Sequence, residues 1–333
     1  MTKISKANPV LRTLAPDAKT NKTKSNADNI AALYAKSPAF TRHAQRMTSC
    51  STSIRRLERV NTKTGGVFMT TQAERCRVRN CPVCQRARSA KLFFQMKPAL
   101  EQINAEHPTY RWVFLTLTVE NCPLTELRET IKAMNAAWSR LLKVKELSCV
   151  KGWLRNVEVT RGKSDANTAH PHFHILLCVP SYYFTGKHYI SQAKFGELWR
   201  DALRVDYVPM VNVQAVKELN SGIAELTKAT TYSVKPSELV DEKGADWLHE
   251  LHTQCDKLRF IASGGLVKQA IAKAKSNVKD SEIDVETIAK DDYDWNKEKR
   301  GYELKKDDAF DAWLATQPTE PILPVGFVES DFL

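Results

Sequence analysis

The sequence predicts an α+β protein with a ferredoxin-like βαββαβ fold, in which an antiparallel sheet carries helices on one face. Two observations support this. Between residues 111 and 216, segments with a period of two and segments with a helical period alternate in the order strand, helix, strand, strand, helix, strand. One of those strands also contains "HPHFH", whose histidines recur every second residue and therefore share one face. We expect the second face of the sheet to stay open for a ligand.

Four segments favour strands. "RWVFLTLTV" and "GWLRNVEVTR" come first, and "HFHILLCV" follows the second after a short polar loop. In the third segment the odd-numbered apolar residues share the face that would pack on helices, and the even-numbered histidines share the other. "YVPMVNVQAV" is predicted as a strand despite its proline. The expected strands are residues 111–119, 152–161, 172–179 and 207–216.

Three segments favour helices. "LTELRETIKAMNAAWSRLLK" carries its large apolar residues at intervals of three or four, which is the spacing of one buried helix face. "SQAKFGELWRDALR" and "SGIAELTKATTYSVK" are the other two, and Pro236 would end the last one. The expected helices are residues 124–143, 191–204 and 221–235.

Charge is unevenly distributed along the chain of 333 residues, whose formal net charge is +12. Residues 276–333 contain 15 acidic and 7 basic residues, a net of −8, so residues 1–275 carry about +20. A basic body with an acidic tail is typical of proteins that bind a polyanion such as nucleic acid. We expect a flexible segment at 1–47, a zinc-binding segment at 48–95, a catalytic domain at 108–275 and an acidic tail at 276–333.

The sequence predicts neither a membrane protein nor a secreted protein. The chain has no run of about 18 apolar residues, and its N-terminal residues lack the apolar core of a signal peptide. Eight cysteines in a chain of this size, without an export signal, do not form the pattern of a secreted disulfide framework. We therefore expect a cytoplasmic protein with no membrane partner.

The histidine strand predicts a metal site. Imidazoles two residues apart on an exposed sheet face can converge on one cation, and His172 and His174 have this spacing. Glu158 precedes His172 by fourteen residues and would lie opposite it in an antiparallel hairpin. Two imidazoles and one carboxylate leave coordination positions open for Mg²⁺ or Mn²⁺ and a phosphate oxygen. His170 is expected to support the metal ligands or to contact the substrate.

The last predicted helix carries "TYSVK", which places Tyr232 and Lys235 on one helix face. A tyrosine can act as a nucleophile when its target is activated by a metal, and a lysine one turn away can hold a phosphate or lower the pKa of the tyrosine. Such a pair is also common on solvated helix surfaces. Its significance here is that the helix could lie across the histidine face.

The strand "FLTLTV", "HPHFHILL" and "YSVK", in this order on a βαββαβ frame, resemble the three motifs of HUH endonucleases. The similarity is greatest to the single-tyrosine initiator (Rep) proteins of rolling-circle plasmids, and it spans about residues 48–270. The resemblance implies that Tyr232 is the nucleophile and that His172 and His174 bind the metal. It implies a nick in single-stranded origin DNA, a 5′-phosphotyrosine link and a free 3′-hydroxyl primer.

One position departs from the family. Related initiators often have a glutamate four residues before the tyrosine, which is assigned to hydrolytic termination, but this chain has Lys228 there. Glu225, one turn earlier on the same helix face, is a candidate for that role. The chain has no phosphate-binding loop of the Gly-x4-Gly-Lys-Ser/Thr kind, so an initiator of this type would need a host helicase and DNA polymerase.

"CRVRNCPVCQRAR" predicts a structural zinc site. Cys76, Cys81 and Cys84 have the spacing of a zinc knuckle, and Cys50 is the expected fourth ligand, with His43 as the alternative. The other four cysteines are expected to be packing residues. The arginines around the knuckle are predicted to contact the phosphates of duplex DNA; they are Arg75, Arg77, Arg79, Arg86 and Arg88.

Three other interpretations remain open at this level. A transposase of an insertion element could use the same zinc segment and single-tyrosine chemistry. A zinc-finger regulator could bind DNA without any catalysis, and its binding would not depend on Tyr232. A metallohydrolase of small molecules would explain neither the basic body nor the tyrosine helix.

Overall fold

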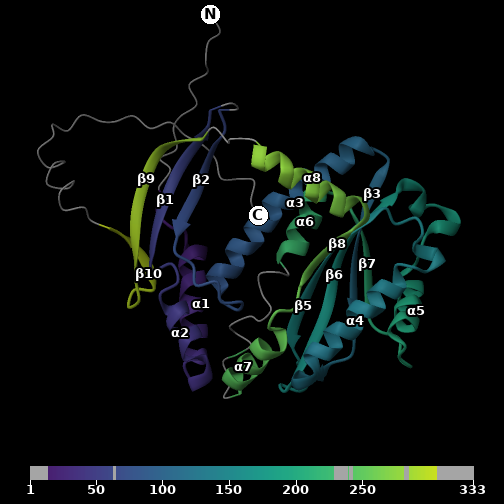
Figure 1. Cartoon of the computed structure of the whole chain (residues 1–333), viewed down its shortest axis with the longest axis horizontal. Helices are drawn as coiled ribbons and strands as arrows, with labels where there is room; N and C mark the ends of the chain where they lie inside the picture. Colours follow the sequence, from purple (N-terminus) through teal and green to yellow (C-terminus); the bar gives the residue numbers. More distant parts are fainter. Residues whose placement is uncertain (1–13, 63–64, 229–238, 240–242, 281–284, 306–333) are drawn as a thin grey trace, which may run out of the picture. The chain divides into compact units, whose positions relative to one another are not determined.

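The structure is a computed structural model that describes residues 14–62, 65–228, 239, 243–280 and 285–305 (Figure 1). Contacts within the chain divide it into two units. The first consists of the described parts of Met1–Ser25, Thr48–Cys76 and Ile283–Leu333, and the second of those of Asn26–Met47 and Arg77–Glu282. The boundary between Cys76 and Arg77 falls inside the predicted zinc-binding segment at 48–95.

The second unit is built on an antiparallel sheet in the order β7-β3-β6-β5-β8. Helix α4 (Leu127–Leu141) follows β3, and helix α5 (Gln192–Leu203) connects β6 to β7. This is the βαββαβ frame that the sequence predicts, with one further strand at an edge. The strands are β3 (Tyr110–Thr118), β5 (Gly152–Arg161), β6 (Thr168–Pro180), β7 (Val211–Val216) and β8 (Ile261–Gly264), and the two-residue β4 (Cys122–Pro123) pairs with β6.

Element boundaries follow local chemistry. β7 begins at Val211 rather than at 207, after Pro209, which has no N–H to donate to a β-ladder. α5 begins after Ser191, whose hydroxyl accepts a hydrogen bond from the backbone N–H of Lys194 at 3.2 Å, as an N-cap does. Helix α6 (Leu219–Lys228) corresponds to the first part of the helix predicted at 221–235. Residues 229–235 of that prediction lie outside the described residues.

One face of this sheet is mostly apolar core, and the buried Arg155 of β5 lies over the ring of Phe173 at 4.1 Å. Phe173, Ile175 and Leu177 of β6 are fully buried, as the odd-numbered alternation predicts, and the ring of Phe173 contacts that of Trp199 on α5. The apolar residues of α4 at intervals of three and four are also buried, from Leu127 to Leu141. Each fully buried side chain of this size contributes about 1.5–3 kcal/mol through removal of apolar surface from water.

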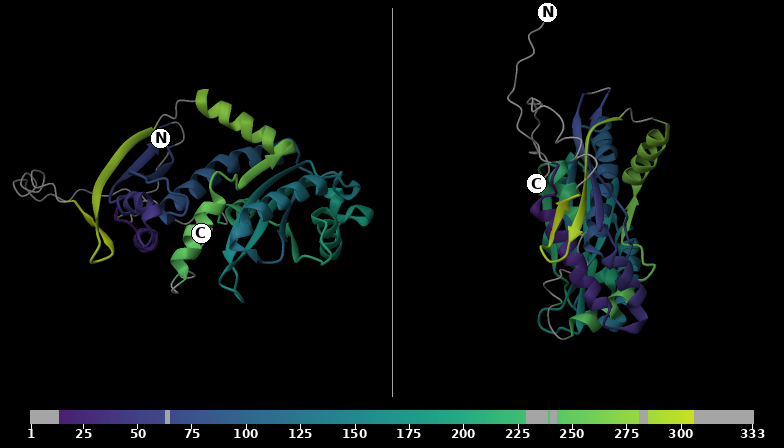
Figure 2. Two further views of the ribbon diagram at one scale, coloured as in Figure 1. Left: turned by 60° about the horizontal axis from the view of Figure 1, so that its bottom comes forward. Right: turned by 90° about the vertical axis from the view of Figure 1, so that its left-hand side faces the viewer.

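The second face is half core and half open, so the prediction of an open face is only partly right. The helices α3 (Pro82–Glu106), α6 and α8 (Gly265–Asp280) pack on Leu154, Leu176 and Cys178, and α3 and α8 run beside each other (Figure 2). After His174 the residues of β6 on this face are apolar, so they must be packed against other elements to be shielded from water. Burial raises the pKa of the Cys178 thiol to about 12, as suits a packing residue.

The first unit contains a separate antiparallel sheet in the order β10-β9-β1-β2, which Figure 1 shows as long neighbouring strands. Its strands are β1 (Ser53–Asn61), β2 (Val67–Ala73), β9 (Val285–Asn296) and β10 (Gly301–Leu304). Residues 285–304 of the expected acidic tail therefore include two of these strands. The reason is charge complementarity: acidic β9 pairs with basic β1, and Arg55 forms an ion pair with Asp292 at 2.7 Å.

The expectation of a flexible segment at 1–47 is wrong for residues 18–47, which contain α1 (Ala18–Tyr34) and most of α2 (Thr41–Thr48). Polar composition concealed these helices, because some of their polar residues are buried with partners. Lys24 is fully buried and its Nζ donates to the carbonyl oxygen of Thr48 at 3.2 Å. The remaining elements are α7 (Gly244–Cys255) and the 3-10 helices Pro38–Phe40, Leu124–Glu126, Lys145–Leu147, Ser181–Phe184 and Gly186–His188.

Candidate metal centre and substrate cleft

The two predicted histidines and the predicted glutamate meet at the polar end of the open face. Glu158 on β5 is paired in register with His172 on β6, and His174 follows on the same face. Both Nε2 atoms converge on one carboxylate oxygen, at 3.0 Å from His172 and 2.7 Å from His174. We call these three residues the triad; their ligand atoms all lie within 4.8 Å of one another, which is close enough to hold one metal ion.

The outer nitrogens of the two imidazoles are fixed by the sheet. His172 Nδ1 lies 3.3 Å from the carbonyl oxygen of His170, and His174 Nδ1 lies 3.3 Å from the hydroxyl of Thr116. A carbonyl oxygen only accepts, so the neutral His172 tautomer that donates from Nδ1 would have its Nε2 lone pair available to a metal ion held together with Glu158. The donor set therefore fits a divalent cation.

The charge state of the carboxylate agrees with this. Burial by itself would raise the pKa of Glu158, but the hydrogen bonds from His172 and His174 outweigh it and lower the pKa to about 2. The carboxylate is therefore ionised near neutral pH. The triad side chains remain between 12% and 19% exposed, so a substrate can reach them. An exposed site with three protein ligands leaves coordination positions open, as catalytic metal sites do.

A cleft adjoins the triad on one side. It has a volume of about 720 Å³ and is lined by His174 and Thr116, by the polar residues Asn212 and Gln214 of β7, and by α6. Glu225, the candidate for hydrolytic termination, lines this cleft from α6. The structure thus brings Glu225 and the candidate metal ligand His174 to the same cavity.

Helix α6 lies close against the sheet because it carries glycine at the contact. A Cβ at Gly222 would lie 3.0 Å from Val216 Cγ1 and 3.2 Å from Leu176 Cδ1, which is tighter than ordinary packing. The carbonyl oxygen of Leu226 accepts a hydrogen bond from the side-chain amide of Asn156 on β5 at 3.4 Å. These contacts fix α6 over the row of the sheet that contains His174. Tyr232 and Lys235 lie beyond α6, outside the described residues.

The predicted cysteine ligands also gather. The sulfurs of Cys50, Cys76, Cys81 and Cys84 lie within 4.8 Å of one another, and all four residues are buried. Backbone N–H groups donate to two of them, from Cys76 to the Cys50 sulfur at 3.4 Å and from Arg77 to the Cys84 sulfur at 3.2 Å. Four converging thiols with amide donors fit a closed tetrahedral zinc site. His43, the alternative ligand, does not belong to this group.

The residues predicted to contact DNA do not all lie in one place. Arg77, Arg79 and Arg88 line a second cavity, whereas Arg75 and Arg86 do not line it. His170 is half-buried next to His172, and its pKa is lowered by burial and by that neighbour. Their contacts with DNA remain predictions.

Sequence reasoning missed several residues of the site. Thr116, which holds His174, lies within the predicted strand "FLTLTV", and Asn212 and Gln214 lie within "VNVQAV". Polar residues at alternate positions of strands that flank the histidine strand would have been a usable signal. His252 and Phe260, which line the second cavity, carried no such signal. None of the described helices is long and apolar enough to cross a membrane.

A ferredoxin-like sheet with this triad is consistent with the HUH-type fold that the motifs predicted. The sequence profile of a family described as "Replication protein" matches residues 67–309. The chain therefore belongs to this family of replication proteins, and the resemblance to plasmid Rep initiators is confirmed.

Individual relatives agree with the family match. The chain is 32% identical over 277 residues to "Protein rep" of Streptococcus pneumoniae, covering 78% of this chain and 84% of the relative. It is 30% identical over 253 residues to "Protein rep" of Bacillus amyloliquefaciens, covering 70% and 73%. A "Replication protein" of Staphylococcus aureus is 30% identical over 233 residues, which cover 64% of this chain and 98% of that protein. No solved structure matches the chain.

Proposed function

We propose that this replication protein initiates rolling-circle replication of a plasmid by nicking single-stranded origin DNA with Tyr232. The observation that carries the proposal is the convergence of His172 Nε2, His174 Nε2 and Glu158 Oε2 beside an open cleft in a chain of the replication-protein family. Family membership favours an initiator over a transposase or a regulator without catalysis.

In this proposal the tyrosine hydroxyl loses its proton and attacks the scissile phosphate. The new bond joins the tyrosine oxygen to the 5′ phosphate, and the bond between that phosphorus and the 3′ oxygen of the preceding nucleotide breaks. The tyrosine proton passes to solvent, the leaving 3′ oxygen takes up a proton in turn, and the resulting 3′-hydroxyl primes synthesis. The triad would hold Mg²⁺ or Mn²⁺, which supplies Lewis-acid activation of a phosphate oxygen when bound. Lys235 would hold the phosphate or stabilise the phenolate. Host helicase and DNA polymerase would continue replication from the primer.

Termination requires the covalent link to be resolved, either by strand rejoining or by hydrolysis. Rejoining is the reverse of nicking, with a 3′-hydroxyl as the attacking group. For hydrolysis we propose that Glu225 accepts a proton from the attacking water, a role supported by its place in the wall of the cleft that contains His174. We expect Glu225→Gln to nick normally but to hydrolyse the phosphotyrosine link at least tenfold more slowly.

The test of the proposal is a covalent adduct. The full-length protein is incubated with Mn²⁺ and a labelled single-stranded oligonucleotide that spans the nick site of its plasmid origin, and the adduct is mapped by peptide sequencing. We expect the label on Tyr232 and none with Tyr232→Phe. Tyr189→Phe, which removes a hydroxyl from an exposed tyrosine elsewhere, is the matched control and should form the adduct normally. A label on Tyr189 or Tyr207, or an adduct in the Tyr232→Phe variant, would contradict the proposal.

The cysteine group would hold a structural zinc ion, because four protein ligands leave no position for a substrate. Elemental analysis should find about one zinc per chain. Cys81→Ser with Cys84→Ser should unfold the segment around the cysteines, since structural zinc sites contribute about 10–16 kcal/mol of apparent binding free energy. Cleavage of a short oligonucleotide should survive in part, because the sheet that carries the triad has its own core. A folded, zinc-free protein would contradict the assignment.

A further inference from the structure

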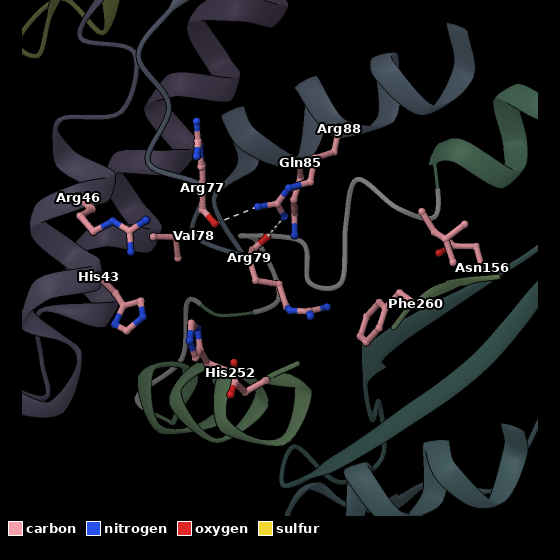
Figure 3. A pocket seen from close by; sticks show the side chains of 12 residues that line it. His43, Arg46, Arg77, Val78, Arg79, Gln85, Arg88, Asn156, His252 and Phe260 are labelled. Carbon is pink, nitrogen blue, oxygen red and sulfur yellow. Dashed lines mark hydrogen bonds between the residues drawn. The ribbon is translucent and has the colours of Figure 1, made fainter. Parts of the chain in front are cut away.

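The second cavity lies at the β8 edge of the sheet that carries the triad, and we call it the arginine pocket (Figure 3). Asn156, at its inner end, is paired in register with His174 and precedes Glu158 by two residues on the same face. Two residues along a strand span about 7 Å. Glu158 of the triad is therefore about 7 Å along β5 from one residue of the pocket lining.

The pocket is strongly cationic. Four arginines, Arg46, Arg77, Arg79 and Arg88, contribute to its lining, whereas Asp256 is its one carboxylate among the described residues. Two of the arginines are held by neutral acceptors. Arg88 donates to the carbonyl oxygens of Arg77 and Arg79 at 3.0 and 3.3 Å, and Arg79 donates to that of Leu258 at 3.0 Å. Carbonyl partners position these guanidinium groups without cancelling their charge.

Burial is the main cause that lowers the pKa of Arg79; nearby Arg88 lowers it further, and Asp256 is among the groups that raise it. Burial is also the main cause that lowers the pKa of His252 to about 4; His43 and Arg79 add to the effect and Asp256 opposes it. An anion bound in this pocket would offset the part of both shifts that comes from neighbouring cations.

The shape suits one small ligand rather than a duplex. The volume is about 460 Å³, within the range of cavities that bind small molecules. Specific contact with duplex DNA buries about 1,000–2,500 Å² of protein surface, which a pocket of this size does not offer. Next to the cations the pocket presents the ring of Phe260, with the Arg79 guanidinium 4.8 Å from the ring centroid. Aromatic rings and guanidinium planes are the surfaces on which nucleic-acid bases stack.

We propose that the arginine pocket binds one nucleoside phosphate unit, with the base against Phe260 and the phosphate against the arginines. The unit comes either from the single strand that crosses the triad or from a free nucleotide. The first source rests on the proposed nicking function, since it needs a strand at the triad. Arg77, Arg79 and Arg88 would then serve a single-stranded nucleotide, in place of the duplex phosphates that the sequence predicted.

The first arm of the test measures binding of a labelled, randomised single-stranded 20-mer by fluorescence anisotropy, without added divalent cation and without chelator, so that zinc stays bound. Arg46→Ala should weaken binding about tenfold and reduce the slope of log affinity against log salt by about one. Arg42→Ala is the matched control, because it removes the same charge from an exposed position on the same helix that does not line the pocket. Phe260→Leu, which keeps an apolar side chain but removes the ring, should weaken binding about 5- to 100-fold.

The second arm titrates the four deoxynucleoside monophosphates, and inorganic phosphate, into the same proteins by calorimetry. A loss of 20-mer binding confined to Arg46→Ala and Phe260→Leu assigns the unit to the strand. Unchanged 20-mer binding, with monophosphate binding that both variants lose, assigns it to a free nucleotide. Equal effects of Arg42→Ala and Arg46→Ala, or no effect of Arg46→Ala and Phe260→Leu in either arm, would overturn the proposal. Thermal unfolding of each variant checks that it is folded.

These outcomes are separable from the nicking hypothesis. Tyr232→Phe should bind the 20-mer like the wild type even though it forms no adduct. If the wild type formed no adduct but Arg46→Ala and Phe260→Leu still lost binding, the pocket would stand and the nicking chemistry would fail. If the adduct formed normally and these two variants bound both probes normally, only the pocket would fail.

Discussion

The two ends of the open sheet face differ although the same strands build them. At one end β3, β5 and β6 present Thr116, Glu158, His172 and His174, and at the other they present apolar side chains such as Leu176 under α3, α6 and α8. The change from site to core takes two residues along β6, from His174 to Leu176.

This comparison shows how the fold supports the triad. The apolar end and the helices packed on it hold the strands in place. The hydrogen-bonded register between the strands then sets the relative positions of the triad side chains at the polar end. Function and stability should therefore separate along β6: substitutions at its histidines should affect chemistry, and substitutions two residues further on should affect folding.

The largest effect is expected at the polar end. His174→Ala, and likewise His172→Ala, should lower the rate of oligonucleotide cleavage by at least about 10³-fold, because a metal contributes several kcal/mol to charge stabilisation at a phosphate. Binding of the single strand should stay within about threefold, since lysine and arginine contacts supply most of the affinity. Gel assays of cleavage and anisotropy of binding would check this pair of results. Normal cleavage in the His172→Ala, His174→Ala double variant would refute the metal assignment.

The matched substitution at the apolar end is Leu176→Ala. Leu176 is fully buried, so the truncation should leave a cavity and lower the free energy of unfolding by about 2–5 kcal/mol. The rate of cleavage per folded molecule, measured well below the unfolding transition, should remain close to that of the wild type. Denaturant unfolding of Leu176→Ala and His174→Ala side by side gives the contrast. Equal destabilisation by the two variants would show that the triad is part of the core.

Much of this contrast was predictable from the sequence. Period-two alternation placed His172 and His174 on one face, and the hairpin spacing placed Glu158 opposite them, because both follow from strand geometry alone. The covering of Leu176 was not predictable in the same way. It depends on α3 and α8, which come from distant parts of the chain and have weak local signals.

The segments that were predicted as a flexible N-terminus and as an acidic tail teach the same lesson. Residues 285–304 are acidic and polar, and only their pairing with basic β1 gives them a place in a sheet. Lys24 is buried with a carbonyl partner 24 residues away. Composition reports what a segment prefers when it is isolated, whereas long-range partners decide whether its polar groups can be buried. The arginine pocket could not be predicted from the sequence for the same reason, since its lining comes from α2, α3, α7 and two strands.

A smaller effect is expected from the carboxylate of the triad. Glu158→Gln keeps the shape of the side chain but removes its negative charge, so both histidines stay in place while the affinity for a divalent cation falls. The Mn²⁺ concentration that gives half-maximal cleavage should rise about 10- to 100-fold, the range typical for perturbed metal sites. At saturating Mn²⁺ most of the activity should return. An unchanged Mn²⁺ titration would remove Glu158 from the metal ligands.

The smallest effect is expected where the two ends meet, under α6. A methyl group at Gly222 would lie 3.0 Å from Val216 Cγ1 and 3.2 Å from Leu176 Cδ1, so in Gly222→Ala either these side chains or α6 must shift by a few tenths of an ångström. The strain is offset by the better helix propensity of alanine, about 1 kcal/mol, so the free energy of unfolding should change little. Cleavage is more sensitive to position, because a misplacement of 1 Å can cost about 100-fold. We therefore expect cleavage to fall by up to about tenfold.

Asn220→Ala, at an exposed position of the same helix, is the control and should cleave normally. Wild-type cleavage by Gly222→Ala would show that the close approach of α6 serves packing alone and that the two ends of the face are independent.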